Sequence, residues 1–116
     1  MTTPRFLNSR EIQLIGKMVE GRPEAERIKG GLGQAKVSDM ADGRMGSLKF
    51  VYDEGVPRRF ARVLVEGAGV DEDGVPIAIA ISIDDLGDLF ELDIWKVDFS
   101  PVRAFPKQVN ISQRIP

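Results

Sequence analysis

The chain has 116 residues with 16 basic and 18 acidic side chains, giving a formal net charge of −2, and this length fits one domain. It contains no cysteine and no histidine, which excludes disulfides, thiolate chemistry and a histidine general base or zinc ligand. A pI near 5.2 argues against a nucleic-acid partner, because duplex-binding domains usually carry a basic surface. No run approaches the length of a membrane span, and residues 1–7 lack the pattern of a signal peptide. We therefore expect a cytoplasmic protein without a cofactor.

The first predicted element is an amphipathic helix over residues 9–20. Three apolar residues recur there at helical spacing: Ile12, Ile15 and Val19. Asn8 and Glu11 have the spacing of a capping box at its start, and Gly21 predicts its end.

A second, shorter helix is predicted over residues 23–29, because proline suits the first turn of a helix. Three glycines follow within residues 30–33. They lack the Lys-Ser/Thr ending and the preceding strand of a phosphate-binding loop, so we interpret them as a linker.

Beyond residue 34 the apolar period changes to two, which predicts strands. The predicted strands cover residues 35–40, 47–53, 58–66, 75–83 and 89–99. Turns are expected at Asp42-Gly43, 54–57, 71–74 and 84–87. These connections are too short for the crossovers that parallel pairing needs. We therefore predict an α+β fold, a single domain over residues 1–116. Both helices pack on one face of an antiparallel meander of four to five strands, and residues 100–116 form an extended tail.

The strand over residues 75–83 has the clearest pattern of the chain. Its odd positions are bulky, whereas its even positions Ala78, Ala80 and Ser82 are small. We expect the bulky row to pack on the helices and the small row to face solvent or another chain.

The last predicted strand changes pattern at Trp95. Phe90, Leu92 and Ile94 share one face, but after Ile94 the apolar set becomes Trp95, Val97 and Phe99. A bulge near Trp95 reconciles the two halves, as does a strand that passes from one packed layer into another.

Six residues are candidates for binding a partner: Glu91, Asp93, Trp95, Lys96, Arg58 and Arg62. A large aromatic residue is typical of an interface hot spot, and it is equally suited to a core or edge position. The two carboxylates share a face, either as an acid–base pair or simply exposed to solvent. The arginines suit an acidic partner or phosphate, or else ion pairs within the protein. The pattern predicts no catalytic residue and no metal ligand.

Two segments carry a resemblance to known proteins. They are residues 42–50 (Asp-Gly-Arg-Met-Gly-Ser-Leu-Lys-Phe) and residues 89–101 (Leu-Phe-Glu-Leu-Asp-Ile-Trp-Lys-Val-Asp-Phe-Ser-Pro). With the leading helix, they resemble a family of small uncharacterised bacterial proteins. The resemblance implies the fold and domain size but no catalytic residues. Small bacterial proteins of this build include toxin-neutralising immunity proteins, a comparison by analogy of fold alone.

Three functions remain open from the sequence. The preferred one is a non-catalytic protein-binding module, with toxin neutralisation as one specific form. The second is a small-molecule or divalent-metal-binding protein, or an enzyme that uses Glu91 and Asp93 with Arg62 or Lys96. The third is a homodimer formed through a sheet edge or through the small face of residues 75–83.

Overall fold

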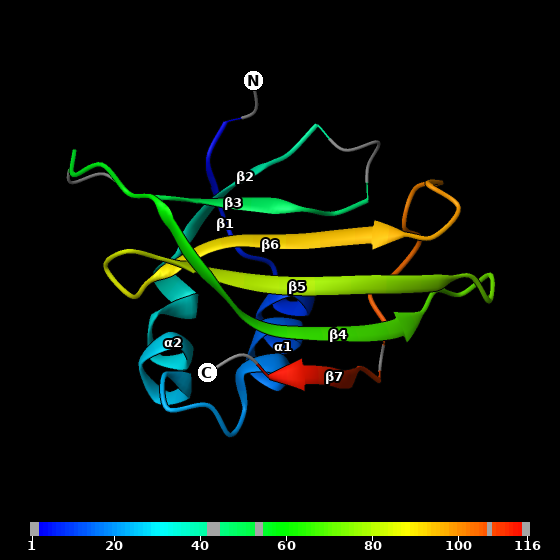
Figure 1. The fold of residues 1–116 in the computed structure, drawn as a ribbon. Coiled ribbons are helices and arrows are strands. Elements are labelled where there is room, and N and C mark those ends of the chain that lie inside the picture. Colours follow the sequence, from blue (N-terminus) through cyan, green and yellow to red (C-terminus); the bar gives the residue numbers. More distant parts are fainter. Residues whose placement is uncertain (1–2, 42–44, 53–54, 107, 115–116) are drawn as a thin grey trace.

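The computed structural model describes residues 3–41, 45–52, 55–106 and 108–114. Within these residues, two α-helices lie on one face of an antiparallel sheet of seven strands (Figure 1). The predicted α+β class and the position of the helices are confirmed, and the sheet is wider than the four to five strands expected. The elements are β1 (Arg5–Phe6), α1 (Ser9–Val19), α2 (Ala25–Gly31), a 3-10 turn (Leu32–Gln34), β2 (Lys36–Asp39), β3 (Leu48–Val51), β4 (Phe60–Val70), β5 (Pro76–Asp84), β6 (Leu89–Lys96) and β7 (Asn110–Arg114).

Helix α1 begins with the predicted capping box. The Asn8 side chain accepts a hydrogen bond from the Glu11 N–H at 2.9 Å, and the Glu11 carboxylate accepts one from the Asn8 N–H at 2.9 Å. Arg5 of β1 binds both carboxylate oxygens of Glu11, at 2.9 and 2.8 Å, and it also binds Asp39 of β2. The buried start of α1 is thereby tied to one edge of the sheet.

The glycines after α2 do not form the linker that the sequence predicts. Gly30 and Gly31 complete the helix, and a 3-10 turn follows from Leu32 to Gln34. Leu32 is buried in the core. Burial of a leucine side chain contributes about 1.5–3 kcal/mol, which offsets the cost of about 1 kcal/mol for each of the two helical glycines.

The strands lie in the order β1-β2-β3-β6-β5-β4-β7. Strands β4, β5 and β6 form the predicted meander of consecutive hairpins. Strand β3 pairs with β6 rather than with β4, so the chain crosses from one side of this meander to the other. The turn predicted at Asp42-Gly43 lies outside the described residues.

The bulky row of β5 forms the centre of the core, as predicted. Its four isoleucines are buried between the sheet and the helices: Ile77, Ile79, Ile81 and Ile83. Of the small residues on the opposite face, Ala78 and Ala80 are only partly buried, whereas Ser82 is buried. The period of two along β5 therefore defines both faces of the sheet.

The predicted change of face at Trp95 does not occur. Pairing with β5 is regular from Leu92 to Lys96, and the register shift lies instead between Ser82 and Ile83, opposite Glu91 and Leu89. Trp95 consequently faces away from the helices and is 43% exposed, while the Lys96 side chain is fully buried. Lys96 takes this inward position because two aspartates neutralise it, a contact that apolar periodicity does not reveal.

The predicted tail also contains a strand. Residues Asn110–Arg114 form β7, which pairs with β4 at one edge of the sheet. The segment leading to β7 crosses the inner side of β4 at Gly67 and Gly69 (Figure 1). A Cβ atom on Gly69 would lie 2.6 Å from Pro106, and one on Gly67 would lie 2.7 Å from Val109. Glycine at both positions makes room for this segment.

We expect Gly69→Ala to lower the free energy of unfolding by about 1–3 kcal/mol, because the added methyl group forces Pro106 away from the sheet. Urea unfolding measures the change. Ala68→Ser on the opposite face is the control and should leave stability nearly unchanged. An equal, small effect of both substitutions would contradict the close contact with Pro106.

Candidate functional site

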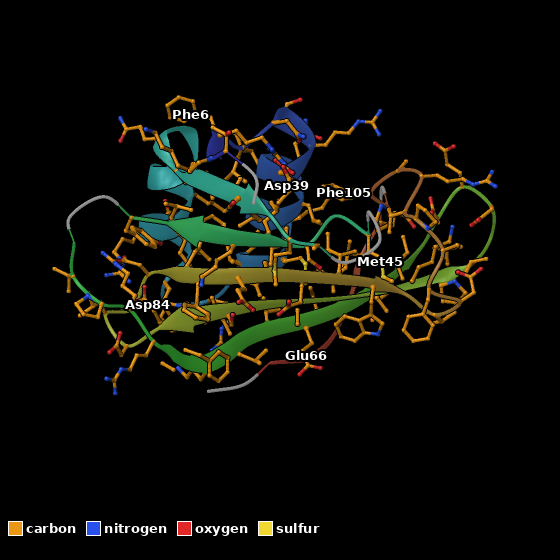
Figure 2. All side chains as sticks on the ribbon, turned by 90° about the horizontal axis from the view of Figure 1, so that it is seen from above. Phe6, Asp39, Met45, Glu66, Asp84 and Phe105 are labelled. Atoms are coloured by element: carbon orange, nitrogen blue, oxygen red, sulfur yellow. The ribbon has the colours of Figure 1, made fainter. Side chains whose placement is uncertain are left out.

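The face of the sheet opposite the helices carries the candidate site. The registers of β4, β5 and β6 arrange nine outward residues in three rows across the strands, and we call this surface the open face. The rows are Ala68–Ala78–Trp95, Glu66–Ala80–Asp93 and Val63–Ser82–Glu91. Glu66 extends from the sheet on the side away from the helices (Figure 2).

The sequence creates this surface by placing small residues along the central strand. Ala78, Ala80 and Ser82 leave a low strip between the longer side chains of β4 and β6. A depression of about 620 Å³ forms there, lined by Met45, Ser47, Val63, Glu66, Ala80, Asp93, Ile94 and Trp95. Its lining combines apolar side chains with two carboxylates.

Hydrogen bonds hold one rim of the depression beside β6. The Ser47 hydroxyl accepts from the Ile94 N–H at 2.8 Å and donates to the Ile94 carbonyl at 3.0 Å. Ser47 and Met45 are both buried. The segment before β3 is therefore fixed against the strand that carries Asp93 and Trp95.

Among the described residues, the open face carries three carboxylates. It carries Glu66, Asp93 and Glu91, with Lys49 of β3 paired opposite Glu91. Partial burial raises the pKa of Glu91, and the neighbouring charge of Asp93 raises it further, while Lys49 opposes both effects. An added positive charge would favour the ionised form of Glu91.

Lys96 points to the other side of the sheet, where it binds two aspartates of the β4–β5 turn. Its Nζ lies 2.9 Å from Asp71 and 2.5 Å from Asp73, and we call these three residues the Lys96 cluster. Asp71 also accepts hydrogen bonds from the backbone N–H groups of Arg103 and Ala104, at 2.8 and 3.1 Å. The cluster thus fastens the segment after β6 to the β4–β5 turn.

The cluster keeps its charges despite burial. Burial alone would raise the pKa of Asp71, but the Arg103 N–H, Lys96 and further backbone N–H groups hold that pKa well below its ordinary value. The contact with Lys96 likewise lowers the pKa of Asp73. Burial would lower the pKa of Lys96, but the two aspartates raise it above its ordinary value. The ion pairs and hydrogen bonds outweigh desolvation here.

These shifts predict loss of stability in acid. Asp71 and Asp73 have lower pKa values in the folded chain than the ordinary 3.8, so the unfolded chain takes up protons first as the pH falls. We expect the free energy of unfolding to drop as the pH falls below about 4, and Asp71→Ala to weaken this dependence. Glu91, whose pKa is raised, acts in the opposite direction. Urea unfolding at neutral and acidic pH measures the effect, and an identical acid dependence in the variant would contradict it.

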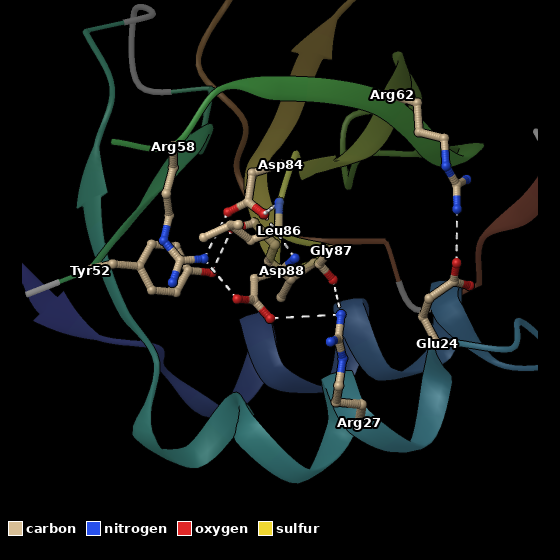
Figure 3. Close-up of polar contacts among 10 residues, drawn as sticks. Glu24, Arg27, Tyr52, Arg58, Arg62, Asp84, Leu86, Gly87 and Asp88 are labelled. Carbon is tan, nitrogen blue, oxygen red and sulfur yellow. Dashed lines mark hydrogen bonds and ion pairs between the residues drawn. The ribbon is translucent and has the colours of Figure 1, made fainter. Parts of the chain in front are cut away.

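Arg58 and Arg62 do not form a shared basic surface. Arg58 stacks on the Tyr52 ring at 3.6 Å and binds Asp84 at 2.9 Å and Asp88 at 2.7 Å (Figure 3). Arg62 binds Glu24 before α2 at 2.8 Å (Figure 3). Both arginines thus form ion pairs within the protein, the second of the two interpretations that the sequence left open.

The Arg58 contacts also order the β5–β6 turn. The buried Asp84 carboxylate accepts hydrogen bonds from the N–H groups of Leu86 and Asp88, both at 2.9 Å. Arg27 of α2 binds the Gly87 carbonyl and lies 3.7 Å from Asp88. This network joins the turn to the helical layer and thereby has a structural role.

A second and larger groove lies between α1 and the segment before β7, with a volume of about 1,230 Å³. Its rim mixes both signs of charge: Arg10 and Lys17 line it together with Glu20 and Glu72. Mixed charges of this kind do not indicate any one class of partner. The open face is therefore the better candidate for a binding site.

The structure thus brings together three of the six predicted residues, Glu91, Asp93 and Trp95, and separates Lys96, Arg58 and Arg62 from them. Sequence reasoning missed Glu66, which joins the site through pairing of β4 with β5. It also missed the role of Asp71, which looked like an ordinary turn residue. Both depend on contacts between segments distant in sequence, for which the local pattern carries no signal.

Among the described residues, no group of three or more Asp or Glu side chains is arranged to hold a metal ion. None of the helices in this part of the chain has the length and hydrophobicity needed to cross a membrane.

Comparison with known proteins identifies a family but no function. No curated protein and no solved structure matches the chain. Residues 4–106, most of the sequence, match a family described as a domain of unknown function, DUF6984. The chain therefore belongs to the DUF6984 family.

Proposed function

We propose that the chain is a non-catalytic, protein-binding module of the bacterial cytoplasm that recognises its partner through the open face. The observation that carries this proposal is Trp95, the single tryptophan, which is 43% exposed near the end of β6 on the sheet face opposite the helices. Tryptophan is enriched among the few interface residues that contribute most of the binding energy. The small side chains of Ala78, Ala80 and Ser82 on the neighbouring strand allow a partner to come close to the sheet.

The turn that follows β6, a few residues after Trp95, carries another exposed aromatic residue. Phe99 is 73% exposed and adopts a left-handed backbone conformation, with φ of 62°. The Phe99 N–H donates to the Lys96 carbonyl at 2.8 Å, and Asp98 accepts from the N–H and hydroxyl of Ser100. A bulky residue with positive φ is strained, and such strain is typical of functional positions. The exposure of Phe99 and its strained backbone both support a role of this residue in binding.

We expect Phe99→Gly to be more stable than Phe99→Ala by about 1 kcal/mol, because only glycine adopts the left-handed conformation without strain. Both variants should bind the partner more weakly than the native chain. Chemical unfolding and partner binding are measured on the same two proteins. Equal stability of the two variants would show that the turn is not strained.

Site-specific photo-crosslinking inside the producing cell tests the proposal. A photoreactive phenylalanine analogue replaces Val63 on the open face or, as the matched control, Gln13 on the exposed side of α1. We expect one discrete crosslinked protein from position 63 and none from position 13. Crosslinking from position 13 alone would place recognition on the helical side and contradict the proposal. Crosslinks between two copies of the chain would favour the homodimer.

Toxin neutralisation is one specific form of this proposal, and the partner would then be a toxic protein. Producing the crosslinked partner without the chain should arrest growth, and coproduction of the native chain should restore it. A partner that has no effect on growth would rule out this form and leave protein binding in place.

A further inference from the structure

We infer that the Lys96 cluster holds β6 in the register that exposes Trp95, and that loss of its two carboxylates lets the end of β6 slip by one residue and bury Trp95. The three residues of the cluster are thus positioning residues, which act on the open face through the facing of β6. Access of a partner to Trp95 then depends on the cluster, a consequence that rests on the proposed function.

The end of β6 exposes its apolar side chains and buries a charge. Trp95, Val97 and Phe99 are 43%, 53% and 73% exposed, whereas Lys96 is fully buried. Alternate residues of a strand lie on opposite faces, so this pattern favours burial of the three apolar residues and exposure of Lys96. The two aspartates, 2.9 and 2.5 Å from the lysine Nζ, oppose that arrangement. Apolar burial and ion pairing therefore favour two different registers of the same segment.

A bulge at Ile94 and Trp95 creates the second register. These two residues then lie together opposite Ile79, with both side chains on the helix side, and Lys96 pairs with Ala78 on the open face. A shift by one residue moves every following side chain to the other face of the sheet. The β5–β6 hairpin already contains one such register shift near its turn, so its pairing accommodates an extra residue.

The segment after β6 is able to follow this slip. Residues 97–106, all of them described, contain no helix and no strand. Phe99 within this segment has a φ of 62°, a strained conformation for a bulky residue and one typical of segments that change conformation. The contact of Lys96 with the Pro101 carbonyl is long, at 3.4 Å. The Lys96 cluster is thus the main restraint on the facing of this segment.

The balance between the two registers depends on which partner of the ion pair is removed. Without the two carboxylates, a buried lysine is costly, so Lys96 turns to solvent and Trp95 turns inward. Methionine in place of Lys96 has the opposite result, because it fills the inward position without a charge. Asp71 then keeps three backbone N–H donors, and Asp73 keeps Arg103 at 3.5 Å. Both kinds of variant remove the same ion pairs but differ in the position of Trp95.

Acrylamide quenching of the single tryptophan measures this difference in the full chain. In Asp71→Asn/Asp73→Asn, the emission should shift to shorter wavelength and the quenching constant should fall by about half or more, since the slip moves a 43% exposed indole into the core. Lys96→Met should keep the native emission and quenching, and adding it to the double variant should restore both. Quenching of the double variant at or above the native value would overturn the inference, as would burial of Trp95 in Lys96→Met.

Circular dichroism shows whether the double variant is folded. If it is unfolded, Asp73→Asn decides, because Asp71 keeps all its contacts in that variant. Quenching of Asp73→Asn below the native value then supports the inference, and equal or stronger quenching overturns it. The measurement needs no partner, so its failure leaves the crosslinking test of the open face intact. Reduced quenching without a crosslink from position 63 would instead keep the control of Trp95 by the cluster and reject the proposed function.

Discussion

Replacing Asp71 with alanine is expected to lower the free energy of unfolding by about 3 kcal/mol, the largest loss of stability predicted here for one substitution. The carboxylate is buried and accepts hydrogen bonds from the N–H groups of Glu72, Arg103 and Ala104, in addition to its contact with Lys96. Alanine removes the acceptor of these three part-buried N–H groups and one of the two carboxylates that neutralise the buried Lys96. Urea unfolding at neutral pH measures the loss.

The same variant should loosen the segment after β6 before the whole chain unfolds. Hydrogen exchange at Arg103 and Ala104 is expected to accelerate, because their amides lose the Asp71 acceptor. Glu72→Ala in the same turn is the control, since that side chain is exposed. Unchanged exchange at both amides would mean that Asp71 does not hold the segment.

The second large effect concerns binding. Trp95→Ala is expected to weaken the partner complex about 30-fold or more, corresponding to a hot-spot loss of at least about 2 kcal/mol. The stability of the chain should change much less, because almost half of this side chain is exposed. Calorimetry with the crosslinked partner, once purified, provides the affinity.

Leu86→Ala is the matched control for Trp95→Ala. Leu86 is an exposed apolar residue in the β5–β6 turn, and its backbone contact with Asp84 survives the substitution. It should leave the affinity unchanged. Equal losses in the two variants would point to a general effect of exposed apolar area rather than to the open face.

Local patterns predicted the elements whose faces are set by burial of apolar residues. The capping box at Asn8 and Glu11 and the isoleucine row of β5 both appear in the structure as expected. Each depends on neighbours within a few residues, where spacing alone defines which side chains share a face. The antiparallel class followed from short connections, again a local property.

The pattern failed where a charge is buried. Lys96 occupies an inward position that periodicity assigns to an apolar residue, and Trp95 occupies the outward position beside it. The reason is the pair Asp71 and Asp73, more than twenty residues earlier in the chain. An ion pair over such a separation is invisible to hydrophobic periodicity, so the predicted bulge fell in the wrong place.

Pairing between distant segments explains the remaining differences. Gly67 and Gly69 leave room for the segment that leads to β7, and β1 is held by the contacts of Arg5 with Glu11 and Asp39. Glu66 joins the site for the same reason, through its register with Ala80. The sequence identified the residues of the open face that lie on β6 and the small row of β5, but not those that β4 contributes.

Recognition through the open face is tested most directly by a label at position 95 that leaves the surface almost unaltered. The single tryptophan is replaced by 5-fluorotryptophan during expression, and the ¹⁹F resonance of position 95 is recorded with and without the purified, unlabelled partner. We expect the resonance to shift and to lose its sensitivity to solvent when the complex forms. An unchanged, solvent-sensitive resonance in a fully formed complex would contradict it.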